Sequence, residues 1–432
     1  MNKVAKNASW IIGIHIVKSL LNLAISMLTA RFLGPSNFGL INYAASLVAF
    51  VTPIMQLGFT GVLVQEMVNS PDKEGEILGT SIPLTFFSSL LCIGGVVSFA
   101  AIANHGEKDT VIVCALYSIL LIFQSFEMLT YWFQTKLLSK YSATVSLVAY
   151  MIVSAYKIYL LSTQKSIYWF AISNALDYLI ISIGLFIVYK RLGGEKLRFR
   201  FCTAKNLFSK GRYYIVSNMM IAVFAQTDRI MLKLMIDDAA TGYYSAAVTC
   251  AGISGFVFSA IIDSFRPTIF GDKKNDPIRY EKDMCLLYGL IIYMSLLSSL
   301  IVSAFSGIII KILYGAAYMP SADALRVVVW YTTFAYLGSV RNIWILAEGK
   351  QKYLWVINLS GALANIALNY VLIPLWGIVG AAVASLITQI FTNVIIGYII
   401  KPIRQNNRLM LRSLNPKYLV GAVKKIKGLS KK

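Results

Sequence analysis

Long apolar stretches, separated by short polar segments, make up most of this sequence. Each is long enough to cross about 30 Å of hydrocarbon as an α-helix, at ~1.5 Å per residue. Twelve stretches lie at roughly 8–30, 40–63, 79–103, 110–132, 142–162, 167–189, 213–235, 242–266, 284–310, 323–346, 354–374 and 378–400. A membrane β-strand needs only about ten residues, so the pattern predicts an all-α polytopic membrane protein with about 12 transmembrane helices.

The second half of the chain repeats features of the first half. Gly39 opens a segment that resembles the one opened by Gly242, and Trp132 corresponds to Trp344. Internal duplication in a very apolar chain is typical of transporters, whose substrate path lies between the two copies. We therefore expect a six-helix bundle over residues 1–200, a second over 201–400 and a basic cytoplasmic tail over 401–432.

Basic residues gather on one side of the predicted membrane. Thirty of the 40 Lys and Arg residues fall in the N-terminus, the tail and the loops on that side. Cytoplasmic loops carry an excess of Lys and Arg, so both termini are predicted to be cytoplasmic. A content of 57% hydrophobic and 14% charged residues excludes a soluble globular class. We interpret the net charge of +21 as orientation and contact with anionic membrane lipids, and expect no nucleic-acid partner.

Polar residues inside the apolar stretches mark candidate binding positions, because an ionisable group at the centre of a membrane helix costs about 2.5–3.5 kcal/mol or more. Lys18 and Asn22 share one face of the first predicted helix, and Arg229 and Lys233 share one face of the seventh. The two faces correspond in the duplication, which predicts a water-filled cleft. Either Lys18, Arg229 and Lys233 hold an anionic substrate, or they pair with buried acids to stabilise the fold.

Other ionisable residues lie elsewhere in the predicted helices. Lys157 and Arg341 are candidate substrate contacts, although both could instead extend to the membrane interface. The acids Asp177, Glu127 and Asp228 are candidate sites for a coupling ion, either a proton or sodium. Structural ion pairing is the alternative for these acids.

Several chemistries find no support in the sequence. It contains no Walker A motif and no His, Cys, Asp or Glu spacing typical of a metal site, and its outer loops are too short for a catalytic domain. We therefore expect a transporter rather than an enzyme, with no metal and no cofactor apart from the coupling ion.

Four segments of the chain resemble bacterial oligosaccharide flippases. They are Arg31 to Ala44, Trp132 to Tyr141, Asp228 to Ala247, and Asn365 to Ala382. Their order and spacing make the chain similar to the Wzx-type O-unit flippases. These form part of the polysaccharide transport branch of the multidrug/oligosaccharidyl-lipid/polysaccharide (MOP) exporter superfamily.

The resemblance implies a MATE-like fold, with two bundles around a V-shaped central cleft. It implies translocation of undecaprenyl-pyrophosphate-linked oligosaccharide units to the outer leaflet of the bacterial inner membrane, by alternating access. O-antigen, capsule or exopolysaccharide assembly would follow, with a polysaccharide polymerase and a chain-length regulator as partners. The alternatives are a multidrug/cation antiporter of the same fold and a membrane glycan polymerase or ligase.

Overall fold

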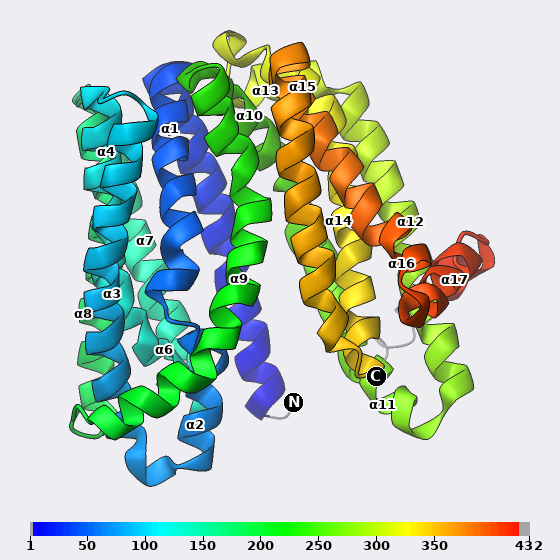
Figure 1. Cartoon of the computed structure of the whole chain (residues 1–432), viewed down its shortest axis with the longest axis horizontal. Helices are drawn as coiled ribbons and strands as arrows, with labels where there is room; N and C mark the ends of the chain where they lie inside the picture. Colours follow the sequence, from blue (N-terminus) through cyan, green and yellow to red (C-terminus); the bar gives the residue numbers. More distant parts are fainter. Residues whose placement is uncertain (1–2, 423–432) are drawn as a thin grey trace. The chain divides into compact units, whose positions relative to one another are not determined.

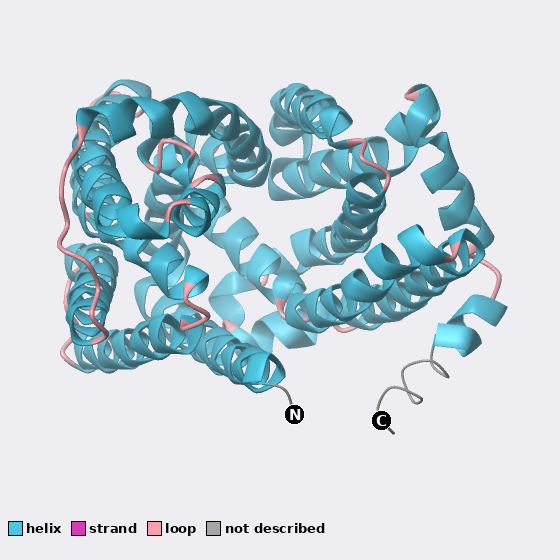
Figure 2. Ribbon diagram, turned by 90° about the horizontal axis from the view of Figure 1, so that it is seen from below, coloured by secondary structure: helices cyan, strands magenta, loops and turns pink. Residues whose placement is uncertain are grey.

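The computed structural model describes residues 3–422, which fold into helices joined by short turns and loops. Figure 2 shows that the described residues contain no strand. They form two compact units, one up to Gly242 and one from Tyr243 onwards. The predicted all-α class is confirmed, whereas the division into bundles at residue 200 stays a prediction.

The first unit is built from α1 to α9 and the start of α10 (Figure 1). Their bounds are α1 Lys3–Met55, α2 Leu63–Asn69, α3 Glu74–Ala103, α4 Lys108–Ser118, α5 Leu120–Gln124, α6 Leu129–Thr135, α7 Ser139–Ser162, α8 Ile167–Arg191, α9 Phe201–Met235 and α10 Asp238–Gly252. Buried aliphatic and aromatic side chains from these helices form its core.

The second unit contains the rest of α10 and the helices that follow it. Their bounds are α11 Gly255–Asn275, α12 Pro277–Ala304, α13 Ser306–Leu313, α14 Ser321–Ala347, α15 Leu354–Ile390, α16 Ile396–Ile399 and α17 Arg404–Arg412. A large cluster of buried side chains joins α11, α12, α14 and α17, with Ile357 of α15 and Ile396 of α16.

Seven helical segments of the described chain are long and apolar enough to cross a membrane, or eight if α10 and α11 together form one bent span. Two of the seven, Ile16–Met55 and Gln351–Ile399, contain 40 and 49 residues. One crossing needs about 20 residues, so each of these is long enough for two. The protein is therefore a multi-pass membrane protein, and the number of twelve spans stays a prediction.

A break in α1 turns the chain back on itself. Gly34 has a φ of 73° and a ψ of 172°, which residues with a side chain rarely adopt. Lys18 and Asn22 before the break line the same cavity as Val48 and Thr52 after it. The connection predicted between the first two membrane helices is thus a single non-helical glycine.

A comparable break divides α15 in the second unit. Gly377 has a φ of 58° and a ψ of −132°, and Pro374 lies three residues before it. Proline cannot supply the helical N–H hydrogen bond, and glycine tolerates the left-handed φ. The eleventh and twelfth predicted helices are joined at this point.

The two glycines that begin the repeated motif face each other within the first unit. A Cβ on Gly39 would lie 1.7 Å from the carbonyl oxygen of Asp238 and 2.8 Å from the nitrogen of Gly242. A Cβ on Gly242 would lie 2.1 Å from the carbonyl oxygen of Pro35. Only glycine permits backbones to approach this closely. The repeated sequence therefore supplies both sides of one contact, between α1 and the start of α10.

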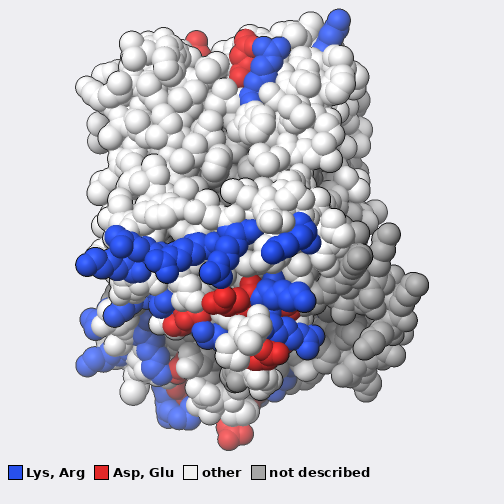
Figure 3. Space-filling view, turned by 90° about the vertical axis from the view of Figure 1, so that its right-hand side faces the viewer, with Lys and Arg blue, Asp and Glu red and all other residues white. Residues whose placement is uncertain are grey.

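The beginning of the predicted basic tail packs against the second unit. Tyr288 of α12 donates a hydrogen bond of 2.8 Å to Oδ1 of Asn406 in α17, and Leu409 and Met410 are buried. On the face shown in Figure 3, Lys and Arg side chains gather mainly toward the lower end, below a belt that carries no charge. Residues 423–432, the end of the predicted basic tail, lie outside the described residues.

The glycine contact yields a stability prediction. Replacing Gly39 with alanine forces α1 and α10 apart, which we expect to cost about 1–3 kcal/mol and to lower the melting temperature of the detergent-solubilised protein. Gly94 of α3 has open space around its Cβ position, so Gly94→Ala is the matched control and should be neutral or slightly stabilising. Equal melting temperatures for the two variants would contradict the close contact.

Candidate functional site

A polar cavity of about 580 Å³ lies within the first unit, among α1, α4, α5, α7 and α8. Its polar lining residues are Lys18, Ser19, Asn22, Thr52, Tyr117, Gln124, Tyr150, Lys157, Asn174, Asp177 and Tyr178. Four residues predicted from the sequence, Lys18, Asn22, Lys157 and Asp177, therefore line one space. Two come from α1, one from α7 and one from α8.

Contacts with α7 hold the side chains of Lys18 and Asn22. The Lys18 ammonium donates a hydrogen bond of 2.5 Å to the hydroxyl of Ser146 and lies 5.6 Å from the ring centroid of Tyr150. The Tyr150 hydroxyl in turn donates to Oδ1 of Asn22 at 2.9 Å. The neutral partners leave the charge of Lys18 available to a ligand in the cavity.

Lys157 and Asp177 bring opposite charges to the same space. Lys157 donates a hydrogen bond of 3.1 Å to Oδ1 of Asn174. Oδ1 of Asp177 is buried and accepts no hydrogen bond from the described residues. Lys18 and Lys157 both act electrostatically on the Asp177 carboxylate, yet neither lies within ion-pair distance of it. Such an arrangement can bind an anion at the lysines or a cation at the carboxylate.

Glu127, Arg229 and Asp228 lie outside the cavity lining. Glu127 belongs to the helical turn Ser125–Met128, which begins directly after the lining residue Gln124. Arg229 donates a hydrogen bond of 3.2 Å to Oε1 of Gln226 and acts electrostatically on Tyr117, a lining residue. Asp228 is buried in α9.

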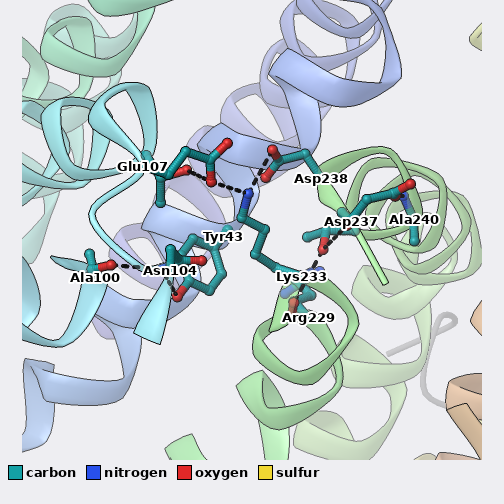
Figure 4. Close-up of polar contacts among 11 residues, drawn as sticks. Tyr43, Ala100, Asn104, Glu107, Arg229, Lys233, Asp237, Asp238 and Ala240 are labelled. Carbon is teal, nitrogen blue, oxygen red and sulfur yellow. Dashed lines mark hydrogen bonds and ion pairs between the residues drawn. The ribbon is translucent and has the colours of Figure 1, made fainter. Parts of the chain in front are cut away.

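Lys233 takes part in a separate cluster near the end of α9 (Figure 4). Its ammonium lies 2.8 Å from a carboxylate oxygen of Glu107 and 2.8 Å from one of Asp238. The Lys233 side chain is only 8% exposed, whereas that of Glu107 is 47% exposed. The hydrogen bond from Lys233 lowers the pKa of Glu107, which lies in the loop before α4. Of the two interpretations of the cations in the membrane helices, the contacts of Lys233 match the one in which a cation pairs with acids.

Arg341 lies in the second unit and is not among the residues that line the cavity. It is 5% exposed on α14, and its Nη1 donates a hydrogen bond of 2.6 Å to the carbonyl oxygen of Thr392. Thr392 belongs to a π-helical turn over Phe391–Ile395. The substrate contact expected at Arg341 stays a prediction.

Sequence reasoning missed several lining residues. Gln124 and Thr52 are polar residues in apolar stretches, which is the same signal that identified Lys18. The lining tyrosines Tyr117, Tyr150 and Tyr178 could not be separated by pattern from the other tyrosines of the chain, which has 25 in all.

Comparisons with known proteins identify related sequences. Residues 4–271 match the sequence model of the family described as "Polysaccharide biosynthesis protein". A putative O-antigen transporter of Shigella flexneri is 22% identical over 400 residues, which cover 88% of this chain and 94% of that protein. An uncharacterized membrane protein of Methanocaldococcus jannaschii is 27% identical over 275 residues, 59% of this chain but only 52% of that protein.

Solved structures share the fold. The lipid II flippase MurJ in an inward closed conformation has a TM-score of 0.71 at 15% identity, covering 93% of this chain and 90% of that one. An inward-facing multidrug resistance MATE family transporter of the MOP superfamily has a TM-score of 0.66 at 12% identity, covering 91% and 95%. The predicted MATE-like fold is confirmed.

The pairing of Glu107 with Lys233 predicts a pH-dependent contribution to stability. A carboxyl whose pKa is lowered on folding stabilises the protein above its ordinary pKa of about 4.3, and this stabilisation is lost as the pH falls through the lowered value. We expect Glu107→Gln to melt below the unmodified protein at pH 7, with the difference vanishing in acid.

Thermal melts of the detergent-solubilised protein between pH 7 and pH 3 test this expectation. The exposed Asp72→Asn is the control and should melt with the unmodified protein at every pH. A Glu107→Gln difference that persists unchanged at pH 3 would contradict the ion pair.

Proposed function

Because the chain belongs to the polysaccharide biosynthesis protein family, we propose that it is a flippase for a lipid-linked glycan. Its substrate class is undecaprenyl-pyrophosphate-linked oligosaccharide repeat units, moved from the cytoplasmic to the outer leaflet of the bacterial inner membrane. O-antigen, capsule or exopolysaccharide assembly then uses the translocated units. The full-length similarity to a putative O-antigen transporter and the fold shared with a lipid II flippase support this proposal.

The polar cavity of the first unit is the observation that carries the proposal. A pyrophosphate and several sugars cannot enter about 30 Å of hydrocarbon without replacement of their hydration. Amide, hydroxyl and phenol groups in the lining replace hydrogen bonds to sugar hydroxyls, and the Lys18 and Lys157 ammonium groups attract negative charge. The polyprenyl tail stays in lipid throughout.

Lys18 and Arg229 hold the pyrophosphate in this proposal. Lys18 lines the cavity, and Arg229 acts on Tyr117 at the same cavity. Both chain termini are cytoplasmic, so the basic loops contact anionic lipid headgroups and the glycan loads from the basic side. Alternating access then exposes the glycan to the outer side, where a polymerase and a chain-length regulator receive it.

Asp177 is the proposed site of the coupling ion. Its carboxylate has one buried oxygen that accepts no hydrogen bond from the described residues, and it faces the same cavity as both lysines. A proton or a sodium ion at Asp177 removes a negative charge that would repel a phosphate. Glu127 is the second carboxylate of this charge cluster.

The same carboxylates support a second candidate function, multidrug/cation antiport, which the shared MATE fold also permits. Deletion of the gene distinguishes the flippase from the antiporter. Loss of surface glycan with unchanged drug sensitivity supports the flippase, and increased drug sensitivity with normal surface glycan supports the antiporter.

Removal of the three cations proposed to bind the anionic substrate should reduce glycan transport. A charge-assisted hydrogen bond contributes about 1.5–3 kcal/mol, so we expect Lys18→Ala, Lys157→Ala and Arg229→Ala each to lower transport about tenfold or more. Surface polysaccharide, measured at matched protein level in a strain that lacks the chromosomal gene, reports the effect. Lys165→Ala, in the exposed loop between α7 and α8, is the control. Normal polysaccharide in all three variants would remove the anion site.

Neutralisation of Asp177 should uncouple transport. Asn keeps the size of the side chain but cannot exchange a proton, so Asp177→Asn should fold normally and lose its response to an imposed proton or sodium gradient. Proteoliposomes with each gradient in turn provide the measurement, and the exposed Asp263→Asn is the control. Gradient-driven transport at the unmodified rate would assign Asp177 a structural role.

A further inference from the structure

We propose that Lys233 and Glu107 form an ionic latch that holds α9 and the start of α10 against the loop between α3 and α4. The latch opens once in each transport cycle, at the end of the first unit opposite the basic loops. This inference rests on the proposed flippase function, because that function requires the end to open.

The latch joins parts of the chain that belong to different copies of the sequence repeat. Glu107 comes from the first copy, and Lys233 and Asp238 come from the second. Figure 4 shows the Lys233 ammonium between the two carboxylates. Lys233 and Asp238 lie five positions apart, so this pair stays within one copy, and the pair with Glu107 bridges the copies.

Each acid is held in place by its own segment. Oε2 of Glu107 accepts a hydrogen bond of 2.7 Å from Thr110, at the start of α4. In the same loop, Asn104 donates a hydrogen bond of 3.0 Å to the hydroxyl of Tyr43. On the other side, Asp238 begins α10, and its carbonyl lies against Gly39. The lysine therefore connects two surfaces that are already ordered.

Two acids on one lysine make the contact releasable. A buried charge that loses its only partner is strongly destabilising, and such a cost would hold the segments together too strongly for a transport cycle. When the bridge to Glu107 breaks, Lys233 keeps Asp238 at 2.8 Å as its partner. Glu107, which is 47% exposed, regains water. The charges on both sides of the opened contact thus stay compensated.

The close glycine contact lies beside the latch. Gly39 of α1 approaches the backbone of Asp238 and Gly242 without intervening side chains. This contact has no directional bond that would resist separation, because it depends on close packing alone. The Lys233–Glu107 ion pair is a directional interaction at this end, and the glycines allow the backbones to pack closely beside it. Lys233 is thus a positioning residue for the transport cycle rather than a substrate ligand.

Substitutions in the full-length protein provide the first test. Loss of the latch shifts the conformational equilibrium away from the state in which this end of the first unit is closed. Lys233→Met and Glu107→Gln should therefore each lower glycan transport about fivefold or more at matched protein level. Lys233→Arg keeps the charge and should stay within about twofold of the unmodified protein. Lys108→Met, an exposed neighbour of Glu107, is the matched control. Full transport by Lys233→Met would overturn the latch.

A reversible lock provides the second test and does not depend on the stability of the variants above. Glu107 and Asp238 contact the same ammonium, so cysteines at both positions lie within reach of a short thiol-reactive crosslinker. The double variant Glu107→Cys, Asp238→Cys is made in a Cys202→Ser background, because Cys202 is the exposed cysteine among the described residues. Before crosslinking, the double variant lacks both carboxylates and should transport at the reduced rate expected of Glu107→Gln. We expect a reducible crosslinker to stop this remaining transport and a reductant to return it to the same reduced rate, whereas the crosslinker should not change transport by either single-cysteine variant.

The two tests separate the latch from the proposed function. Transport that continues at an unchanged rate in the crosslinked protein overturns the latch and leaves the flippase function intact. A deletion strain with normal outward movement of the lipid-linked glycan overturns the flippase function itself. Arrest by the crosslinker with recovery on reduction supports the latch, because a purely structural contact is not impaired by a covalent bond that reinforces it.

Discussion

The structure depends on one constraint: polar and ionised groups inside hydrocarbon must be enclosed by protein. A lysine facing lipid at a helix centre costs about 2.5–3.5 kcal/mol or more, so an apolar chain retains such residues only where protein or water surrounds them. In the first unit, Lys18, Lys157 and Asp177 meet in a cavity lined by amides, hydroxyls and phenols. The apolar surface of the helices faces outward, with Leu91 79% exposed and Phe87 64% exposed.

The same constraint explains why the cations of this chain have different surroundings. Lys18 and Lys157 have neutral hydrogen-bond partners and line the cavity, where we propose that they attract an anion. Lys233 pairs with two carboxylates. Arg341 donates to a backbone carbonyl in a buried part of the second unit. Partner chemistry, rather than the presence of a positive charge, separates a candidate substrate contact from a structural or gating one.

The fold was largely predictable from the sequence, because long apolar stretches in lipid must be helical and the breaks coincide with Gly34 and with Pro374 near Gly377. The site was only partly predictable. Periodicity places Lys18 and Asn22 on one face of a helix, but it gives no information about neighbours from α7 and α8. The pairing of Lys233 with Glu107 joins residues 126 positions apart, which no local pattern indicates.

Photo-crosslinking from inside the cavity tests the central claim most directly. A photoreactive residue in place of Gln124, which lines the cavity, is compared with one at Leu91, which faces outward. In cells that synthesise the lipid-linked glycan, illumination at position 124 should capture the undecaprenyl-pyrophosphate oligosaccharide, and position 91 should capture only membrane lipid. Capture of the glycan carrier at neither position, with both proteins folded and abundant, would contradict the account.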